Sequence, residues 1–203
     1  MTIINKIIKC TDFPCPDIDT KCHVIPNIEI NPDRISIVMI SECAPENLND
    51  YFYSGSDSLF EKTTVQAFID AGANVSSIQD IVDLGIYLTT AVKCRKTEYV
   101  IKSSTIKECS LILEKEISFF PNVKAFLLMG DAAIKSINYI AKRVGEKRVI
   151  PPGSTYKIRG EEYSFKGCRA FPSYLQAGPS FFIEKSKRRM ISEDISEALN
   201  LLK

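Results

Sequence analysis

The sequence predicts an α/β protein in which helices cover both faces of a parallel sheet. Short apolar segments rich in β-branched residues alternate with segments of helical spacing, and each of the first three predicted strands is followed by a helix. This alternation favours a parallel sheet, because parallel neighbours need a crossover connection. A length of 203 residues, 45% hydrophobic and 25% charged, suits one globular domain over residues 1–203. Residues 1–34 are rich in Pro and Asp and lack periodicity, so we expect an irregular N-terminal arm there.

The first strand and two helices are predicted between residues 35 and 84. Ile35–Ile40 is a short apolar run typical of a buried strand, and a loop over residues 41–57 follows it. Helical spacing predicts a helix over Ser58–Gly72 that ends at its glycine. A second, short helix is capped by Ser77 and runs to Leu84.

The middle of the chain is predicted to supply two more strands, each followed by a helix. Ile86–Val92 is the second strand. The segment Thr105–Glu108 has the form of a capping box, which predicts a helix from there to about Phe119. Val123–Met129 is the third strand, and it leads into a helix over Asp131–Arg143.

The last part is predicted to hold a hairpin, a short strand and a final helix. Thr155–Arg159 and Glu162–Lys166 alternate around a glycine, the pattern of a β-hairpin. Cys168–Phe171 is the final strand, and the last helix covers about Phe182–Leu202. Ligands of such sheets bind at the carboxyl ends of the strands, so we expect the site in the loops after residues 40, 92, 129 and 171.

The charge of the chain is unevenly distributed. The net charge is +1, but residues 140–190 hold twelve Lys or Arg and four acids, a local charge of +8, which leaves −7 elsewhere. A polyanion such as DNA is therefore one predicted partner, through a basic face, and ordinary solvated surface charge is the other interpretation.

No membrane or secretion segment is expected. The longest apolar runs are far shorter than the about 20 residues of a membrane-spanning helix. Met1–Lys9 lacks the long apolar core of a secretion signal. We therefore expect a cytoplasmic protein without a membrane partner.

Seven cysteines are an odd number for a disulfide framework. Buried thiols, a catalytic thiol or metal ligands remain as interpretations. Cys10 and Cys15 flank a turn, Cys94 ends a strand and Cys109 lies in the next helix, so four thiolates could meet around an iron–sulfur cluster. Zinc, with the single histidine His23, is an alternative.

The loops after the strands carry candidate chemistry. Glu42 follows the first strand and precedes an aromatic triplet, which would give an acid and a flat stacking surface. Three cations follow the second strand, in Lys93-Cys94-Arg95-Lys96, and suit phosphate binding. Incidental surface acids and cations are the alternative interpretation. The single histidine excludes a serine triad, and the sequence contains neither a P-loop nor a GxGxxG motif.

Four segments, taken in order, resemble the motifs of the uracil-DNA glycosylase superfamily, and above all those of its iron–sulfur branch. The resemblance extends from about Cys10 to Leu202. Its segments are Ser41-Glu42-Cys43-Ala44-Pro45, Thr90-Ala91-Val92-Lys93-Cys94-Arg95-Lys96, Met129-Gly130-Asp131-Ala132-Ala133 and Phe171-Pro172-Ser173-Tyr174-Leu175. The chain departs from the family at Phe171, where the family has histidine, and at Thr90, where it has asparagine.

The resemblance implies a three-layer α/β/α sandwich and DNA base-excision repair, in which a damaged or deaminated base is flipped out and its N-glycosidic bond is hydrolysed. Glu42 would position the water. The base pocket would consist of Ser41, Cys43, Phe52, Tyr53, Thr90 and Phe171. DNA would be contacted by Lys93, Arg95, Pro172, Ser173, Tyr174, Lys185, Lys187, Arg188 and Arg189. A [4Fe–4S] cluster would be held by Cys10, Cys15, Cys94 and Cys109, with Cys22 as a substitute for Cys10.

Two other functions remain open from the sequence. One is a catalytically inactive relative that binds nucleic acid. The other is an enzyme that acts on a small nucleotide or nucleoside in the same pocket.

Overall fold

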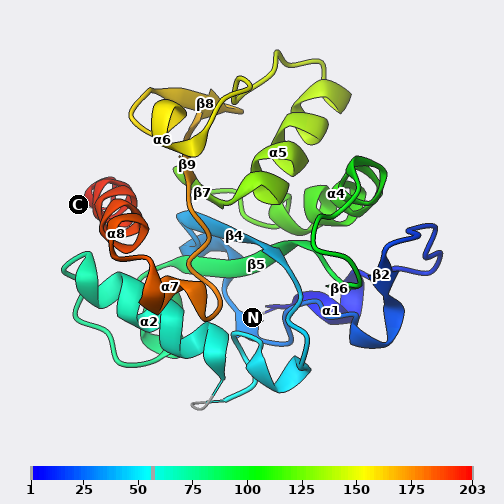
Figure 1. Ribbon diagram of the computed structural model, residues 1–203, viewed down its shortest axis with the longest axis horizontal. Coiled ribbons are helices and arrows are strands. Elements are labelled where there is room, and N and C mark those ends of the chain that lie inside the picture. The colour runs from blue at the N-terminus through cyan, green and yellow to red at the C-terminus, as the bar shows by residue number, and fades with distance from the viewer. Residues whose placement is uncertain (1, 56–57, 203) are drawn as a thin grey trace.

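The computed structural model describes residues 2–55 and 58–202 and has a five-stranded sheet at its centre (Figure 1). Four strands are parallel and the fifth, at one edge, is antiparallel. This confirms the predicted α/β class with a mainly parallel sheet. Across the sheet the strands are β5 (Ile86–Val92), β4 (Ile37–Cys43), β7 (Ala125–Met129), β9 (Cys168–Ser173) and β8 (Tyr163–Phe165).

Helices cover both faces of the sheet (Figure 1). On one face α2 packs against α8, and on the other α4 packs against α5. This arrangement is compatible with a three-layer α/β/α fold. The helices of eight residues or more are α2 (Leu59–Asp70), α4 (Ser103–Ile117), α5 (Asp131–Arg143) and α8 (Lys185–Asn200). Shorter ones are α1 (Ile4–Ile7), α3 (Ile78–Asp83), α6 (Thr155–Ile158) and α7 (Ser180–Ile183).

The strand predictions succeed because the central strands are buried on both faces, which requires nearly continuous apolar runs. All seven residues of β5 and all five of β7 are buried. The first strand is longer than predicted, because β4 continues to Cys43 and pairs with β5 there. Glu42 therefore lies at the end of a strand rather than in a loop. Residues 56–57 of the predicted loop lie outside the described residues.

The N-terminal arm has more structure than its composition predicts. Within residues 2–34, β1 (Thr2–Ile3) pairs with β3 (Glu29–Ile30), and β2 (Ile18–Asp19) pairs with β6 (Arg95–Lys96). Short 3-10 turns also occur within residues 2–34, at Thr20–Cys22 and Pro32–Arg34, and a further one follows β4 at Leu48–Asp50.

The predicted capping box at Thr105 is wrong. Helix α4 begins two residues earlier, at Ser103, and its N-cap, Lys102, makes no side-chain cap. The cap comes instead from the N-terminal arm. The Asp17 carboxylate accepts a hydrogen bond from the Lys102 backbone N–H at 2.6 Å, and it accepts another from the Thr105 hydroxyl. Asp17, 85 positions before Lys102, thus caps the N-terminus of α4, which the predicted capping box was expected to do.

Replacing Asp17 by asparagine is expected to lower the free energy of unfolding by about 1.5–3 kcal/mol at neutral pH, the size of hydrogen bonds to a charged group. Burial raises the pKa of Asp17, but the hydrogen bonds from Lys102 and Thr105 outweigh burial and lower it. The unfolded value is about 3.9. The stabilisation is therefore fully present above about pH 4 and is lost as the pH falls through the folded value. Urea unfolding of both proteins should show a difference at about pH 7 that shrinks towards about pH 3; a difference independent of pH would contradict this.

The predicted hairpin is displaced along the chain. The segment Thr155–Ile158 forms helix α6 rather than a strand. The hairpin joins β8 to β9 through Lys166 and Gly167, which have φ angles of 51° and 77°. Two positive φ angles are the signature of the turn that matches the twist of a two-residue hairpin. Arg159 fixes the preceding segment, because its guanidinium bonds to Asp194 on α8 at 2.7 Å.

The last helix begins at Lys185 rather than at Phe182, because Glu184 leaves the helical conformation between α7 and α8. Within the described ranges, none of the helices has the length and apolarity that crossing a membrane demands.

Candidate functional site

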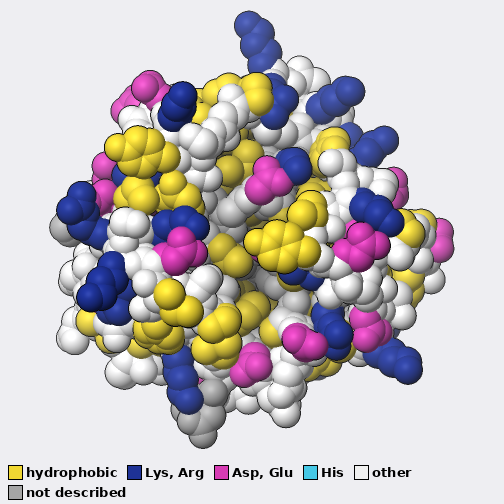
Figure 2. Space-filling view, in the orientation of Figure 1, with side chains coloured by type: hydrophobic (Ala, Val, Ile, Leu, Met, Phe, Trp, Pro, Cys, Tyr) yellow, Lys and Arg dark blue, Asp and Glu magenta, His cyan; other side chains and the backbone are white. Residues whose placement is uncertain are grey.

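A hollow of about 400 Å³ opens at the carboxyl end of β4, and we call it the strand-end pocket. Figure 2 shows a depression near the centre of this face of the molecule. Three of the four segments that the resemblance singled out contribute to it: all of Ser41–Pro45, Arg95 and Lys96 at the end of the second segment, and Leu175 at the end of the last. The pocket is lined by Ser41, Glu42, Cys43, Ala44, Pro45, Glu46, Phe60, Arg95, Lys96, Thr97, Glu98, Leu175, Ala177, Gly178 and Pro179.

Buried hydrogen bonds join the first of these segments to Gln176, the residue that follows the last one. The Ser41 hydroxyl and the Gln176 side-chain amide exchange hydrogen bonds at 3.0 and 3.1 Å, and both residues are wholly buried. The same amide group donates to the Thr64 hydroxyl at 3.4 Å. Because these polar groups are out of water, breaking one hydrogen bond leaves a buried partner unsatisfied, and these bonds therefore hold Ser41 and Gln176 in place.

An ion pair stands in the wall of the strand-end pocket. The Lys96 ammonium group lies 2.8 Å from Glu42 Oε1, and both side chains are about a quarter to a third exposed, 31% and 26%. Lys96 Nζ also donates to the Tyr99 carbonyl at 3.0 Å. Burial alone would lower the pKa of Lys96, but the hydrogen bond and the charge of Glu42 raise it. Lys96 is therefore a cation at neutral pH.

The other charged and nucleophilic groups of this pocket are less suited to chemistry. Arg95 pairs with Glu46 at 3.3 Å, and Glu46 is 83% exposed, so this pair stands at the rim. Burial raises the pKa of the Cys43 thiol to about 11, so the thiol is neutral at neutral pH and is a weak nucleophile.

Four residues of the predicted base pocket do not line this hollow. Thr90 is adjacent to Ser41 in the sheet but is wholly buried. Phe171 is buried beneath the Arg169 guanidinium, which lies 4.9 Å from its ring centroid. Phe52 and Tyr53 line a separate hollow. The Tyr53 hydroxyl is occupied by hydrogen bonds with both backbone groups of Leu88, so it closes the edge of β5.

Three residues predicted to contact DNA have side chains that are buried in the structure. Lys93 is wholly buried and its ammonium group lies 2.5 Å from the equally buried Glu116 carboxylate. Pro172 and Ser173 lie within β9, buried, and the Ser173 hydroxyl donates to Asp194. These side chains belong to the core rather than to a surface.

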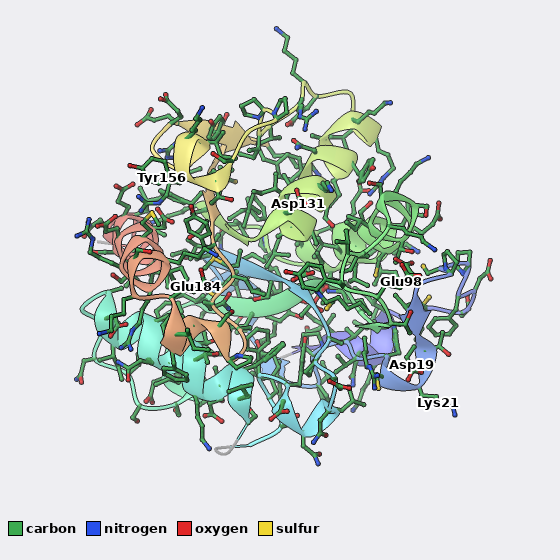
Figure 3. All side chains as sticks on the ribbon, in the orientation of Figure 1. Asp19, Lys21, Glu98, Asp131, Tyr156 and Glu184 are labelled. Carbon is green, nitrogen blue, oxygen red and sulfur yellow. The ribbon has the colours of Figure 1, made fainter. Side chains whose placement is uncertain are left out.

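The cations of the final helix are exposed or half-exposed, but three of the four are paired with acids. Lys187 pairs with Glu184, Arg188 with Asp70 on α2, and Arg189 with Glu193. Lys185 is exposed, and Tyr174 is half-buried with the Lys187 ammonium group 5.6 Å from its ring. Figure 2 shows basic and acidic side chains interspersed on this face, and Figure 3 places Glu98, Asp131 and Glu184 among them. The local charge of +8 is thus partly neutralised by the fold.

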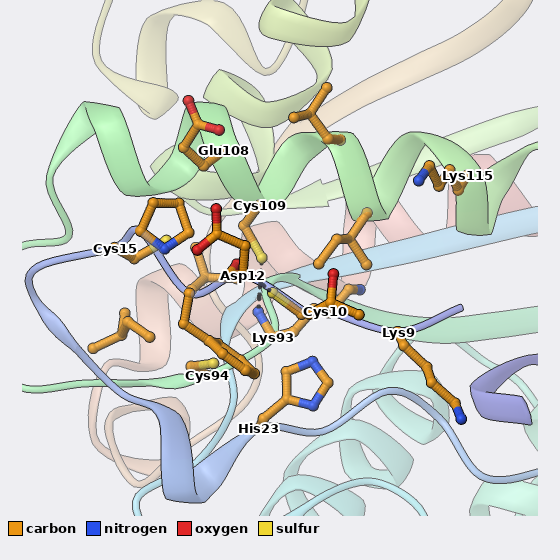
Figure 4. Close-up of a pocket in the computed structure, with 17 residues that line it drawn as sticks. Lys9, Cys10, Asp12, Cys15, His23, Lys93, Cys94, Glu108, Cys109 and Lys115 are labelled. Carbon is orange, nitrogen blue, oxygen red and sulfur yellow. Dashed lines mark hydrogen bonds between the residues drawn. The ribbon is translucent and has the colours of Figure 1, made fainter. Parts of the chain in front are cut away.

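A second hollow, of about 250 Å³, brings together the four cysteines predicted as ligands (Figure 4). We call it the cysteine pocket. Cys10 and Cys15 come from the N-terminal arm, Cys94 follows β5, and Cys109 lies on α4. Its lining comprises Lys9, Cys10, Thr11, Asp12, Phe13, Pro14, Cys15, Ile18, His23, Val92, Lys93, Cys94, Glu108, Cys109, Leu111, Ile112 and Lys115. Cys22, the predicted substitute for Cys10, is not in this lining; its thiol lies 3.8 Å from the Glu46 carbonyl.

The thiols of the cysteine pocket favour the protonated form. Burial, and secondly the neighbouring thiols, raise the pKa of Cys94 to about 12. Burial raises the pKa of Cys109 to about 11 although the charge of Lys93 opposes it. Binding of a metal centre would therefore release protons here.

Four thiols with a single histidine beside them make a soft donor set, which fits iron–sulfur or zinc chemistry. Across residues 2–55 and 58–202, no three His, Cys, Asp or Glu side chains form a group that would hold one metal ion. A four-iron cluster is several atoms across, and its thiolate ligands therefore stand around it rather than converge on one point. The residues present fit such a cluster in number and type.

The two pockets are joined by the ribbon of β2 and β6. Lys96 of β6 is opposite Ile18 of β2, and the Thr97 backbone N–H donates to the Asp17 carbonyl at 3.0 Å. The arm that carries Cys10 and Cys15 thus also supports the backbone of Lys96. A change in the cysteine pocket is expected to reach the strand-end pocket through this ribbon.

Two residues have a larger part than the sequence indicated: Lys96 in the strand-end pocket, and Gln176, which hydrogen-bonds to the pocket residue Ser41. In the sequence, Lys96 is one of three neighbouring cations that suit phosphate binding. Its place beside Glu42 depends on the pairing of β2 with β6. No sequence pattern pointed to a role for Gln176, because its hydrogen-bond partner, Ser41, is 135 residues away. No protein-family model and no curated protein sequence matches this chain.

Proposed function

We propose that this protein is a DNA N-glycosylase of the uracil-DNA glycosylase type, which removes a damaged or deaminated base in base-excision repair. The observation that carries the proposal is the strand-end pocket, whose lining joins residues of three resembling segments and holds the Glu42 carboxylate beside Lys96. A volume of about 400 Å³ is within the range of small-molecule sites. A flipped-out base would enter this pocket from the duplex.

Glu42 is the residue proposed to activate water. Its Oε1 is held by Lys96, and its Oε2 accepts no hydrogen bond from the residues that the structure describes. Oε2 is therefore available to accept the proton of a water molecule that attacks the sugar carbon. The glycosidic bond then breaks, and its electron pair stays with the departing base. Such a general base contributes about 10²–10⁴-fold to the rate.

The cysteine pocket supports the same proposal. The resemblance implies ligands at Cys10, Cys15, Cys94 and Cys109, and these four thiols line one hollow although the arm and α4 are far apart in sequence. A cluster held there would fasten the arm to β6 and α4. Its proposed role is structural, because it lies beside the support of Lys96 and outside the strand-end pocket.

A second candidate is an enzyme that hydrolyses a free nucleoside or nucleotide. The observation that favours it is the pairing of Lys187, Arg188 and Arg189 with acids, which leaves fewer cations for a duplex backbone. Comparing uracil in a duplex with free deoxyuridine and its monophosphate separates the two candidates.

The direct test is incubation with duplexes that carry uracil, hypoxanthine or xanthine, followed by alkaline cleavage at abasic sites. We expect excision of at least one base, and a loss of about 10²–10⁴-fold in Glu42→Gln. Glu46→Gln is the matched control, because Glu46 lines the same pocket but is 83% exposed. Wild-type activity no higher than that of Glu42→Gln on every duplex would contradict the proposal, and release of base from the free nucleoside alone would favour the second candidate.

A further inference from the structure

We propose that Lys96 is a catalytic residue of the strand-end pocket, where its ammonium group hydrogen-bonds the base as the base departs with negative charge. This inference rests on the proposed glycosylase function and identifies a partner for the leaving group, in addition to Glu42 for the water.

Hydrolysis of the glycosidic bond needs a group that stabilises the departing base. When the bond between sugar and base breaks, the electron pair goes to the nitrogen of the base, which becomes an anion. A hydrogen-bond donor aimed at that anion stabilises it more strongly in the pocket than the same donor would in water, because the local dielectric constant is lower in the pocket. Phe171 cannot serve, since its side chain has no donor and is buried under Arg169.

Lys96 has the donor capacity that the task needs. An ammonium group has three N–H donors. Two are used, one by Glu42 Oε1 at 2.8 Å and one by the Tyr99 carbonyl at 3.0 Å. The third has no acceptor among the residues that the structure describes. It belongs to a group that is 31% exposed and lines the same hollow as Glu42.

The position of Lys96 is fixed at both ends of the side chain. Its backbone pairs with Ile18 in the β2–β6 ribbon, and its ammonium group is held by Glu42 and Tyr99. A preorganised donor loses little entropy when the substrate binds. The other cation in the lining, Arg95, is committed to Glu46 at the rim.

The proposed step balances in atoms and charge. The oxygen of a water molecule forms a bond to the anomeric carbon, and Glu42 accepts one proton of that water. The bond from carbon to base nitrogen breaks, and the base retains the electron pair. Lys96 keeps its proton throughout and holds the anion by a hydrogen bond. The anion then takes up the proton that Glu42 received, so the products are the free base and an abasic sugar.

The test is the dependence of excision on the leaving group. Duplexes carrying uracil or 5-fluorouracil are compared, because fluorine stabilises the departing anion and lessens its need for a donor. We expect Lys96→Met to slow uracil excision by about 10²–10³-fold, and to slow 5-fluorouracil excision distinctly less. Lys96→Arg, which keeps a charged donor, should restore part of the uracil activity.

Lys135→Met is the matched control, since it also removes a lysine from an ion pair, that with Asp131, outside the strand-end pocket. We expect rates within about twofold of wild type for this variant. Thermal unfolding of each variant shows whether it is folded.

The outcomes separate the two proposals. An equal loss on both duplexes in Lys96→Met would mean that Lys96 only positions Glu42, and the inference would be wrong while the glycosylase function stands. Wild-type protein that excises no base from the uracil, 5-fluorouracil, hypoxanthine and xanthine duplexes, like Glu42→Gln, would overturn the proposed function and this inference with it.

Discussion

Replacing Lys93 by methionine is expected to lower the free energy of unfolding by about 3–5 kcal/mol, because the Glu116 carboxylate is then left charged and unpaired in the core. Lys93 and Glu116 are both wholly buried, and their charged atoms are 2.5 Å apart. Lys93 Nζ also donates to the Thr89 hydroxyl at 2.7 Å and to the Thr90 carbonyl at 2.6 Å. Urea unfolding followed by circular dichroism measures the loss.

The double variant Lys93→Met/Glu116→Gln should lose far less stability than Lys93→Met alone. Glu116→Gln added to Lys93→Met removes the stranded charge and keeps an acceptor for Tyr87 and Thr89, which bond to this carboxylate at 2.6 and 2.7 Å. We therefore expect the double variant to regain most of the lost stability.

A surface pair provides the control for Lys93. Lys102 pairs with Glu98 at 3.6 Å and both side chains are about half exposed, so Lys102→Met should change the free energy of unfolding by less than about 1 kcal/mol. A similarly small effect of Lys93→Met would contradict the burial of the Lys93–Glu116 pair. Weaker DNA binding by a Lys93→Met protein of unchanged stability would instead restore the surface role that the sequence predicted.

Replacing Cys94 by serine is expected to abolish the visible absorption of protein purified without oxygen, if the cysteine pocket holds the proposed iron–sulfur cluster. Cys94 is buried and lines the same hollow as Cys10, Cys15 and Cys109. The expected result is loss of iron and of colour together.

The same change is expected to loosen the N-terminal arm, because a cluster would crosslink Cys10 and Cys15 to Cys94 and Cys109. Hydrogen exchange should then quicken in β2 and β6, whose pairing joins the arm to Lys96. Cys168→Ser is the matched control: its thiol donates to the Val123 carbonyl at 3.0 Å, away from the cysteine pocket. Colour and exchange should stay as in wild type.

Colourless wild-type protein prepared without oxygen would contradict the cluster. Metal analysis of that protein would then decide between zinc, held with the help of His23, and four free thiols. Colour retained in Cys94→Ser but lost in Cys22→Ser would show that the ligand set is wrong.

Much of the sheet could be predicted from local pattern, because parallel strands buried on both faces must be apolar throughout. Ile86–Val92 and Asp131–Arg143 have the predicted bounds. The local sequence pattern gave wrong predictions where a residue far away in the chain decides the local conformation. Asp17 caps α4 in place of Thr105, and Asp194 fixes Arg159 beside a helix where alternation predicted a strand.

The candidate site was predictable in its parts but not in its assembly. The carboxyl end of β4 was the expected place for Glu42, and the four cysteines expected to meet do line one hollow. The aromatic residues Phe52 and Tyr53 were expected in the same pocket as Glu42, yet the Tyr53 hydroxyl is held by the edge of β5. Sequence shows which groups exist, whereas their distances follow from strand order and register.

The sequence by itself determined the fold class, most of the elements and the segment ends that carry polar chemistry, because these depend on periodicity and on local conformational preferences. Only the tertiary structure decided which charges are available. Lys93 and Lys96 are three residues apart and look alike in the sequence. One faces the core, where it neutralises Glu116, and the other faces the strand-end pocket beside Glu42. The physical reason is that the role of a charge depends on its exposure to water and on its nearest opposite charge, and both are set by segments far away in the chain.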